Sequence, residues 1–232
     1  MIVGEQKPFD EIWRMISGRA GVLVAGCGTC MSVCFAGGEK EVGILASMLR
    51  MHARKEGKEL DVREATIKRQ CDAEFIDELA PKVEGVDAVL SIGCGAGIQY
   101  LAERFPGKPV LPGVNTRFIG ITREQGEWLE RCAACGDCVL DRTAGVCPVA
   151  RCAKRIHNGP CGGSHGGKCE VAGERDCAWA LIVQRLEALG RMTDYDDIVP
   201  PRDWRTNRDG GQRKSEREDL KEPGPDAPAH KG

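Results

Sequence analysis

Residues 21–30 read Gly-Val-Leu-Val-Ala-Gly-Cys-Gly-Thr-Cys, an apolar run that ends in glycine and leads directly into two cysteines. A short, continuous apolar segment bounded by glycine is typical of a buried strand. The stretch therefore predicts a buried strand that delivers cysteines to one end of a sheet.

Strand and helix patterns alternate through the first 111 residues. A lead-in helix is predicted before residue 18, with Phe9, Ile12, Trp13 and Ile16 on its packing face, and a helix over 39–55 has Val42, Leu45, Ala46 and Leu49 on one face. Further strands are predicted at 60–67, 88–92 and 109–111, and further helices at 73–79 and 98–104. The connections are long enough for parallel pairing, so the sequence predicts an α/β fold with a small Rossmann-like parallel sheet.

Cysteines follow three of these predicted strands. Cys27, Cys71 and Cys94 each lie after the carboxyl end of a strand, and Cys30 and Cys34 follow Cys27 closely. Because the carboxyl ends of parallel strands share one edge, where ligands of such folds bind, these cysteines are expected to converge. The preferred ligand set for one cluster is Cys27, Cys30, Cys34 and Cys94, with Cys71 as a neighbour or a substitute ligand.

A nucleotide site is the rival interpretation of this edge. Gly26-Cys-Gly28 and Gly93-Cys-Gly95 resemble the start of a glycine-rich phosphate loop. The third glycine of a dinucleotide fingerprint is replaced by Met31 in the first case and by Ile98 in the second, and a bulky side chain there disturbs the helix–strand approach. The glycines are better suited to letting backbone amides approach inorganic sulfides.

A second cysteine run has tighter spacing. Two residues separate each of Cys132, Cys135 and Cys138, and Cys147-Pro148 follows after eight more residues. Three cysteines in one tight turn, with a fourth downstream, are typical of a loop that wraps an iron–sulfur cube. A structural zinc, which also accepts a Cys-x2-Cys pair, is the alternative.

The remaining cysteines are more widely spaced. They are Cys152, Cys161, Cys169 and Cys177, and they lie in a glycine-rich, turn-rich stretch that cannot build an ordinary core. They are candidates for a further cluster or a zinc, with Cys152 also able to serve the cluster begun at Cys132, and one or two of them simply pack. His157 and His165 lie near them, so a mixed metal site is a further alternative.

Composition limits the function classes. The chain has 232 residues, a net charge of −2 and a pI of about 6.1, with no basic face that would favour nucleic acid. It has no apolar run long enough for a membrane span and no pattern of an export signal, so a cytoplasmic location is expected. Thirteen cysteines in a reducing compartment indicate metal ligands rather than disulfides.

Three regions are predicted: an α/β domain over 1–121, a cysteine-rich metal-binding module over 122–199 and a disordered polar tail over 200–232. Thr122-x-x-Gln125 favours a helix that reaches Arg131. Asp176 is expected to cap a helix over 177–189 with Ala180, Val183, Leu186 and Leu189 on one face. The tail has 8 Lys/Arg against 7 Asp/Glu, so its removal should leave the metal content unchanged. Trp204 is the one aromatic residue of this polar tail, and it is either simply exposed or an anchor for a partner.

Several of these segments also resemble a known family. The stretches are Gly26–Glu39, Ser91–Gln99, Arg151–Ser164 with its Asn-Gly-Pro-Cys-Gly-Gly-Ser sequence, Gly167–Glu170 and Cys177–Trp179. They resemble the MetV-type small subunit of bacterial methylenetetrahydrofolate reductase, and the later ones resemble the C-terminal domain of that reductase. The resemblance covers roughly residues 15–195.

This resemblance implies a division of labour. In such enzymes flavin and folate lie on a separate MetF-type flavoprotein, and the small subunit relays electrons through iron–sulfur clusters, although zinc binding has also been described. The chain is thus expected to hold two [4Fe-4S] clusters, or three, to carry no flavin and to have no folate-reducing activity alone. A ferredoxin or a larger redox complex is the implied electron donor. The alternatives are a zinc-stapled scaffold and an independent enzyme with a substrate-binding cluster at the sheet edge.

Overall fold

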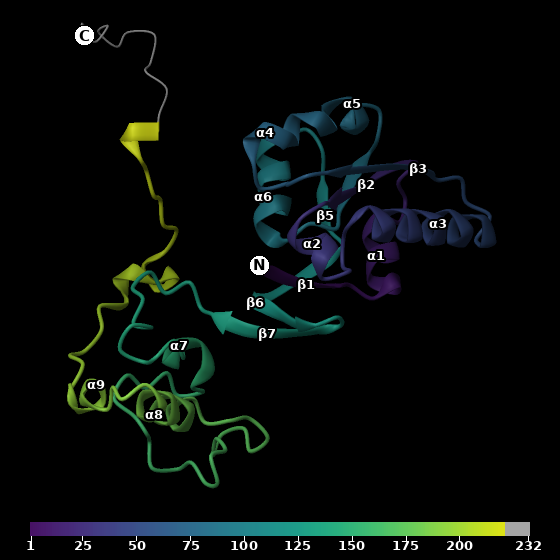
Figure 1. Cartoon of the computed structure of the whole chain (residues 1–232). Coiled ribbons are helices and arrows are strands. Elements are labelled where there is room, and N and C mark those ends of the chain that lie inside the picture. The colour runs from purple at the N-terminus through teal and green to yellow at the C-terminus, as the bar shows by residue number, and fades with distance from the viewer. Residues whose placement is uncertain (221–232) are drawn as a thin grey trace, which may run out of the picture. The chain divides into compact units, whose positions relative to one another are not determined.

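The structure is a computed structural model that describes residues 1–220 (Figure 1). The chain forms two compact units. Unit 1 contains Met1–Ala133 and Val149–Arg155, and unit 2 contains Ala134–Pro148 and the described residues from Ile156 onward.

Unit 1 is built on a four-stranded parallel sheet. Its strands, in spatial order, are β3 (Asp61–Ile67), β2 (Gly21–Cys27), β4 (Ala88–Ser91) and β5 (Val110–Pro112). They are connected by α3 (Glu39–Lys55), then α4 (Ala73–Ile76), η1 (Asp77–Leu79) and α5 (Ala80–Val83), and then α6 (Gly95–Arg104). The parallel α/β sheet predicted from the sequence is confirmed. Chain progression reverses between β2 and β4, which makes this boundary the switch point where ligands of such sheets bind.

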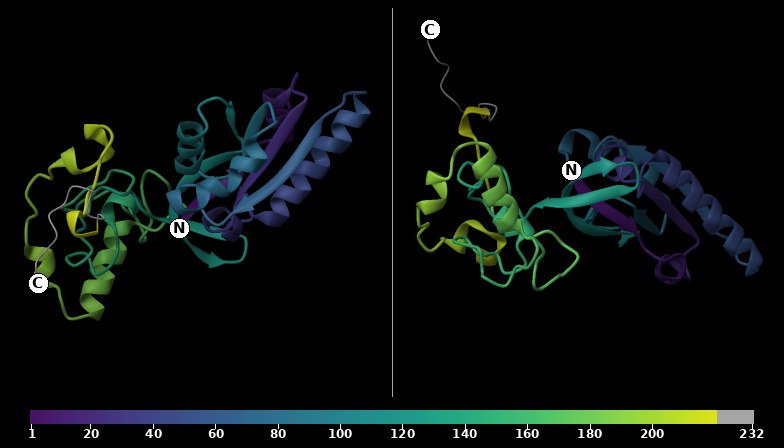
Figure 2. Two further views of the ribbon diagram at one scale, coloured as in Figure 1. Left: turned by 90° about the horizontal axis from the view of Figure 1, so that it is seen from above. Right: turned by 60° about the horizontal axis from the view of Figure 1, so that its bottom comes forward.

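The side chains of β2 divide the core of unit 1 into two layers. All seven residues of β2 are buried, and successive side chains point to opposite faces of the sheet. Val22 and Val24 pack on the face that also buries Ile12 of α1 (Phe9–Ile16) and Leu49 of α3. Leu23 packs on the other face with the α4–α5 and α6 helices, which Figure 2 shows in two further views. The apolar run in the sequence therefore reflects a strand covered on both sides.

A second sheet in unit 1 was not predicted from the sequence. It is antiparallel, in the order β1 (Ile2–Gln6), β6 (Val114–Glu124) and β7 (Glu127–Cys132). The helix predicted from Thr122-x-x-Gln125 is wrong, because this segment forms the β6–β7 hairpin, with Gly126 at φ +89° in its turn. Thr122 instead pairs with Trp128. Strand β6 therefore runs through residues 121 and 122, where the sequence placed the boundary between the α/β domain and the cysteine-rich module. Pairing with β1 and β7 overrides the local capping pattern.

The loop after β2 folds back onto the sheet. The short helix α2 (Cys30–Val33) is followed by Gly37, whose backbone oxygen accepts a hydrogen bond from the Cys27 amide at 2.8 Å. A Cβ atom on Gly37 would lie 1.8 Å from the backbone oxygen of Ile92, just after β4. Only glycine permits this approach, which holds the α2 loop against the end of β4.

Unit 2 contains few regular elements. They are α8 (Ala178–Ala188), the single turn α9 (Thr193–Asp196) and three 3-10 turns, η2 (Trp204–Thr206), η3 (Arg208–Gly210) and η4 (Glu218–Leu220); one further turn, α7 (Pro148–Arg151), follows Cys147 where the chain passes between the units.

Helix α8 has the length predicted from the sequence, but two details of the prediction differ. Its buried face is Ala178, Trp179, Ile182 and Leu186, whereas Leu189 is 54% exposed. Leu186 is buried as predicted, but Leu189 is not, because the helix is anchored by Trp179, whose indole Nε1 donates to the backbone oxygen of Ile156 at 2.9 Å. Cys177 occupies the N-cap position, and the Asp176 carboxylate pairs with Lys168 at 2.7 Å instead of capping.

Part of the predicted tail makes contacts within unit 2. Trp204 is half-buried, and its ring meets that of His157 edge-on at 5.6 Å. Polar side chains of the predicted tail, those of Arg202, Thr206 and Arg213, donate to backbone oxygens of unit 2. The prediction that residues 200–232 are disordered when the protein is alone stays a prediction. The rest of the predicted tail, 221–232, lies outside the described residues.

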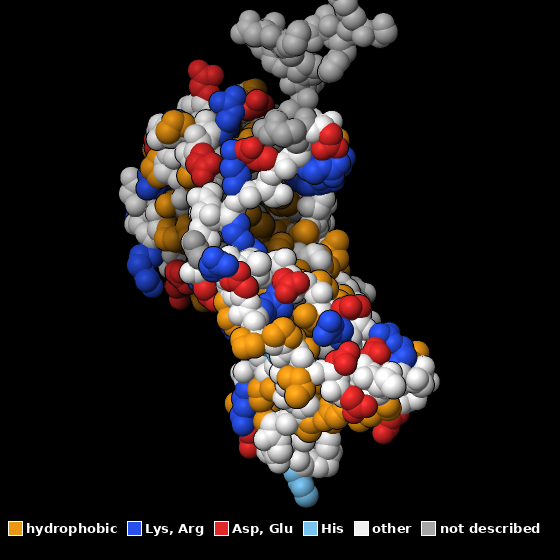
Figure 3. Space-filling model, turned by 90° about the vertical axis from the view of Figure 1, so that its left-hand side faces the viewer, with side chains coloured by type: hydrophobic (Ala, Val, Ile, Leu, Met, Phe, Trp, Pro, Cys, Tyr) orange, Lys and Arg blue, Asp and Glu red, His pale blue; other side chains and the backbone are white. Residues whose placement is uncertain are grey.

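The distribution of charge on the surface and the apolar character of the helices can be compared with the predictions from composition. On the face shown in Figure 3, acidic and basic side chains are interspersed among hydrophobic ones. Within residues 1–220, none of the helices has the length and apolar character required to cross a bilayer.

Candidate functional site

Four cysteines lie at the carboxyl edge of the parallel sheet in unit 1. Cys27 is the last residue of β2, and Cys30 opens α2 immediately after it. Cys71 follows β3, and Cys94 follows β4 as the N-cap residue of α6. Because β3, β2 and β4 are neighbours in the sheet, adjacent strands deliver these thiols to the switch point.

The surroundings of Cys71 raise the pKa of its thiol. Partial burial of its sulfur raises the pKa of Cys71, although the residue itself is exposed, and the thiols of Cys94, Cys27 and Cys30 raise the pKa of Cys71 further. Like charges close together oppose ionisation, which is the physical cause of that additional shift. A cationic group bound among them would reverse it.

Cys34 has a different environment. It is 4% exposed, and its thiol donates to the backbone oxygen of Cys30 at 3.1 Å. Burial raises the pKa of Cys34, and Cys30 is the one cysteine that contributes to the shift. Strand topology therefore brings Cys71 to the same edge as Cys27, Cys30 and Cys94. The sulfur of Cys34 instead faces the backbone oxygens of Cys30 and Met31.

A buried amide supports this edge. Gln70 is 1% exposed, and its side-chain nitrogen donates to the backbone oxygens of Ala25 at 2.9 Å and Gly26 at 3.0 Å. Its side-chain oxygen accepts from the Ser91 hydroxyl at 2.6 Å. Ser91 Oγ in turn accepts from the Gly93 amide at 3.1 Å. The Gln70 side chain thus joins the ends of β2 and β4. These bonds also fix the position of Gln70 itself, which directly precedes Cys71. Sequence periodicity gives no signal for such a residue.

Replacing Gln70 by leucine should destabilise unit 1. The change removes the donor to two carbonyls and leaves the buried Ser91 hydroxyl without its acceptor, at a cost of about 1–3 kcal/mol. We expect a lower midpoint in urea unfolding of the reduced chain, monitored by circular dichroism. Gln99→Leu is the control, because Gln99 bonds only its own helix, to the oxygen of Gly95, at an exposed site. Equal midpoints for the two variants would contradict a structural role of Gln70.

The edge is looser than a closed ion site. Among residues 1–220, no three His, Cys, Asp or Glu side chains lie close enough together to hold one metal ion. The four thiols nevertheless fit an iron–sulfur group in chemistry and number, since such clusters are held by four thiolates. Because the thiolates of a four-iron cluster bind different irons, they stand farther apart than the ligands of a single ion.

The second cysteine run starts in unit 1 and continues into unit 2. Cys132 ends β7, whereas Cys135, Cys138 and Cys147 lie in unit 2. Ala134 and Gly136 have φ angles of +50° and +86°, so the chain turns sharply around Cys135. Cys132 and Cys138 are exposed, and Cys135 and Cys147 are partly buried.

A buried cation tests whether this loop fits an anionic cluster. The Arg202 side chain is 3% exposed, and its Nη2 donates to Cys135 Sγ at 3.1 Å. Its Nε and Nη1 are buried without a hydrogen-bond partner in the described chain. Unpartnered donors beside a thiol fit a negatively charged group, which a thiolate-ligated cluster supplies. Sequence reasoning missed Arg202, which sits just after Pro200-Pro201 in the predicted tail.

The remaining candidates differ in exposure and surroundings. Cys161 is exposed, and its thiol donates to a Glu170 carboxylate oxygen at 3.5 Å. Cys177 is buried, Cys169 is partly buried, and Cys152 lies in the short segment 149–155 of unit 1. The two histidines of this region are His165, whose backbone pairs with Lys168, and His157, whose pKa is lowered by burial and by nearby Arg202. Their roles as ligands stay predictions.

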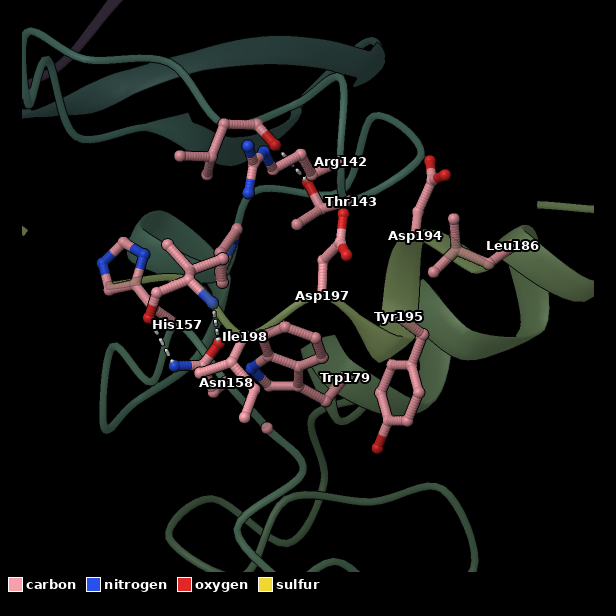
Figure 4. Close-up of a pocket in the computed structure, with 14 residues that line it drawn as sticks. Arg142, Thr143, His157, Asn158, Trp179, Leu186, Asp194, Tyr195, Asp197 and Ile198 are labelled. Carbon is pink, nitrogen blue, oxygen red and sulfur yellow. Dashed lines mark hydrogen bonds between the residues drawn. The ribbon is translucent and has the colours of Figure 1, made fainter. Parts of the chain in front are cut away.

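A cavity of about 170 Å³ lies within unit 2 (Figure 4). Trp179 and Tyr195 line it, with ring centroids 6.4 Å apart. Asn158 closes another side by bonding both the amide and the oxygen of Val199 at 2.8 Å. None of the described residues that line this cavity is a cysteine. It therefore belongs to the packing around α8 rather than to either cysteine group.

Comparison with known proteins identifies one region of the chain. Residues 111–205 match the family model described as methylene-tetrahydrofolate reductase C terminal. The match covers less than half of the chain and includes all cysteines from Cys132 to Cys177, together with Arg202. It relates this region to methylenetetrahydrofolate reductase. No curated protein and no solved structure matches the chain.

Proposed function

We propose that the chain is an iron–sulfur electron-transfer subunit that serves a flavin-containing methylenetetrahydrofolate reductase. The observation that carries the proposal is the grouping of Cys27, Cys30, Cys71 and Cys94 at the switch point of the sheet. The family match over residues 111–205 supports the choice of partner, a MetF-type flavoprotein. The chain itself then needs neither flavin nor folate.

Two clusters follow from the cysteine groups. The edge group holds one through Cys27, Cys30, Cys71 and Cys94, in which Cys71 replaces the Cys34 favoured by spacing. The loop group, Cys132, Cys135, Cys138 and Cys147, holds the other, and Cys152 is its substitute ligand. Cys161, Cys169 and Cys177 are left for a third site, where zinc is the alternative to iron.

Such clusters, when bound, supply one-electron redox chemistry. The part of this chain is to hold them and to set their potentials through ligand charge, hydrogen bonds and burial. At the edge, the Gly37 approach and the Gln70 bridge fix the ends of β2 and β4. Rigid strand ends keep thiolate positions constant between oxidation states, which favours rapid electron transfer. A ferredoxin or a larger redox complex is the proposed donor.

Metal analysis of the anaerobically purified chain tests the proposal. We expect brown protein with about eight irons per chain, two cubes of four, and a paramagnetic resonance signal after reduction. Colourless protein with only stoichiometric zinc would overturn electron transfer and favour the zinc-stapled scaffold. Substrate turnover by the iron-loaded chain without its flavoprotein would favour the third candidate, an independent enzyme that binds substrate at the sheet edge.

A further inference from the structure

The segment from Arg202 to Thr206 lies on the loop that contains Cys135. Arg202 Nη2 donates to Cys135 Sγ at 3.1 Å and also to the backbone oxygen of Asp137. The Thr206 hydroxyl donates to the backbone oxygen of Cys135 at 2.9 Å. A Cβ on Gly136 would lie 2.2 Å from the Thr206 oxygen, so the two backbones touch. We call residues 202–206 the strap.

The strap is itself held in place within unit 2. Arg213 Nη1 donates to the backbone oxygen of Thr206 at 2.7 Å. The ring of Trp204 lies beneath the Arg202 guanidinium, with 5.3 Å from the Arg202 Cζ to the ring centroid, and edge-on to His157. These contacts, together with the Cys135 bonds, fix the guanidinium between an aromatic face and a sulfur atom.

The charge of Arg202 is poorly compensated by the described residues. Its nearest carboxylate is that of Asp137, 3.8 Å away and 60% exposed. Two of its three guanidinium nitrogens, Nε and Nη1, are buried without a partner in residues 1–220. Burying a charged group with unmade hydrogen bonds is expensive, and guanidinium has donors but no acceptor. The arrangement therefore calls for an anion at Cys135.

We propose that Arg202 is a positioning residue that donates to the Cys135 thiolate and the sulfides of a cluster bound through it, and that it raises the reduction potential of that cluster. The inference rests on the proposed function. Arg202 stabilises the additional negative charge that uptake of one electron brings, because charge-assisted hydrogen bonds to sulfur favour the more negative state. The strap then shields the same sulfurs from water.

Arg202→Gln tests this role, with Arg205→Gln as the matched control. Arg205 lies in the same strap, but its side chain is 89% exposed and pairs with Asp203. Both changes are made in the full chain that also carries Cys94→Ser, so that the loop cluster is observed alone. Iron content and the reduction potential are measured by metal analysis and by a dithionite titration followed by paramagnetic resonance.

We expect Arg202→Gln to weaken one-electron reduction about tenfold, which lowers the potential by about 59 mV, and Arg205→Gln to leave it unchanged. If Arg202→Gln loses the loop iron, Arg202→Lys, which keeps the charge but not the forked donors, should retain iron at a lowered potential. If Arg202→Gln binds iron and its reduction potential is unchanged, the inference about Arg202 is overturned, but the proposed function is not. If Arg202→Gln loses iron, an unchanged potential in Arg202→Lys has the same meaning. A parent chain that binds no iron at the loop would instead overturn the proposed function.

Discussion

Cys71→Ser is expected to cost the chain about four irons, one complete cube, while the loop cluster survives. The change replaces a soft thiolate by a weakly acidic hydroxyl that holds iron poorly. Cys71 is coupled to Cys94, Cys27 and Cys30, and it lies on the surface, where serine disturbs no packing. Iron per chain, together with the paramagnetic resonance spectrum of the reduced protein, measures the loss.

Cys34→Ser is the matched control for this experiment. Its buried thiol donates to the backbone oxygen of Cys30, and a hydroxyl can make the same bond, so iron content should stay at the parent level. Loss of iron from Cys34→Ser with full retention in Cys71→Ser would restore the ligand set favoured by spacing alone. Cys94 belongs to both sets, so Cys94→Ser should lose the edge cluster in either case, and Cys135→Ser should lose the loop cluster.

The parts of the fold that the sequence predicted are those in which local pattern and burial agree. The 21–27 run is apolar because β2 is covered on both faces, and the helical stripe from Val42 to Leu49 is the buried face of α3. Alternation of such segments was enough to predict a parallel sheet. The placement of Cys27, Cys71 and Cys94 after consecutive strands follows from the same topology.

The parts that were missed depend on distant partners. β6 is exposed over much of its length, so its burial gives no clear pattern. Its pairing with β1 joins residues more than a hundred positions apart, such as Ile2 and Ile119. Local sequence showed only a capping pattern at Thr122. In α8 the apolar residues are spread over more than one face, so periodicity alone could not decide that Trp179 rather than Leu189 is buried.

The candidate sites also divide into features that local sequence predicts and features that depend on distant residues. Cysteine spacing identified the groups, but the chain near Cys34 turns its sulfur inward, and no spacing rule reports that direction. Gln70 and Arg202 act through side-chain bonds to residues 44 and 67 positions away. Composition classed the segment around Arg202 as a polar tail, because one buried arginine does not change the average of a charged stretch.

Truncation after Pro200 is expected to remove the loop cluster, in contrast to the prediction from composition. The deletion takes away Arg202, which donates to Cys135, and Thr206, which bonds the backbone of the same residue. Without the strap, the Cys135 turn loses its cover and its positive charge, so about four irons should be lost while the edge cluster remains. Truncation after Leu220 is the control, because it retains the whole strap and Arg213, and it should keep the parent iron content. Equal iron in the two truncated chains would show that the loop holds its cluster unaided, and that the contacts of residues 202–213 serve only the packing of unit 2.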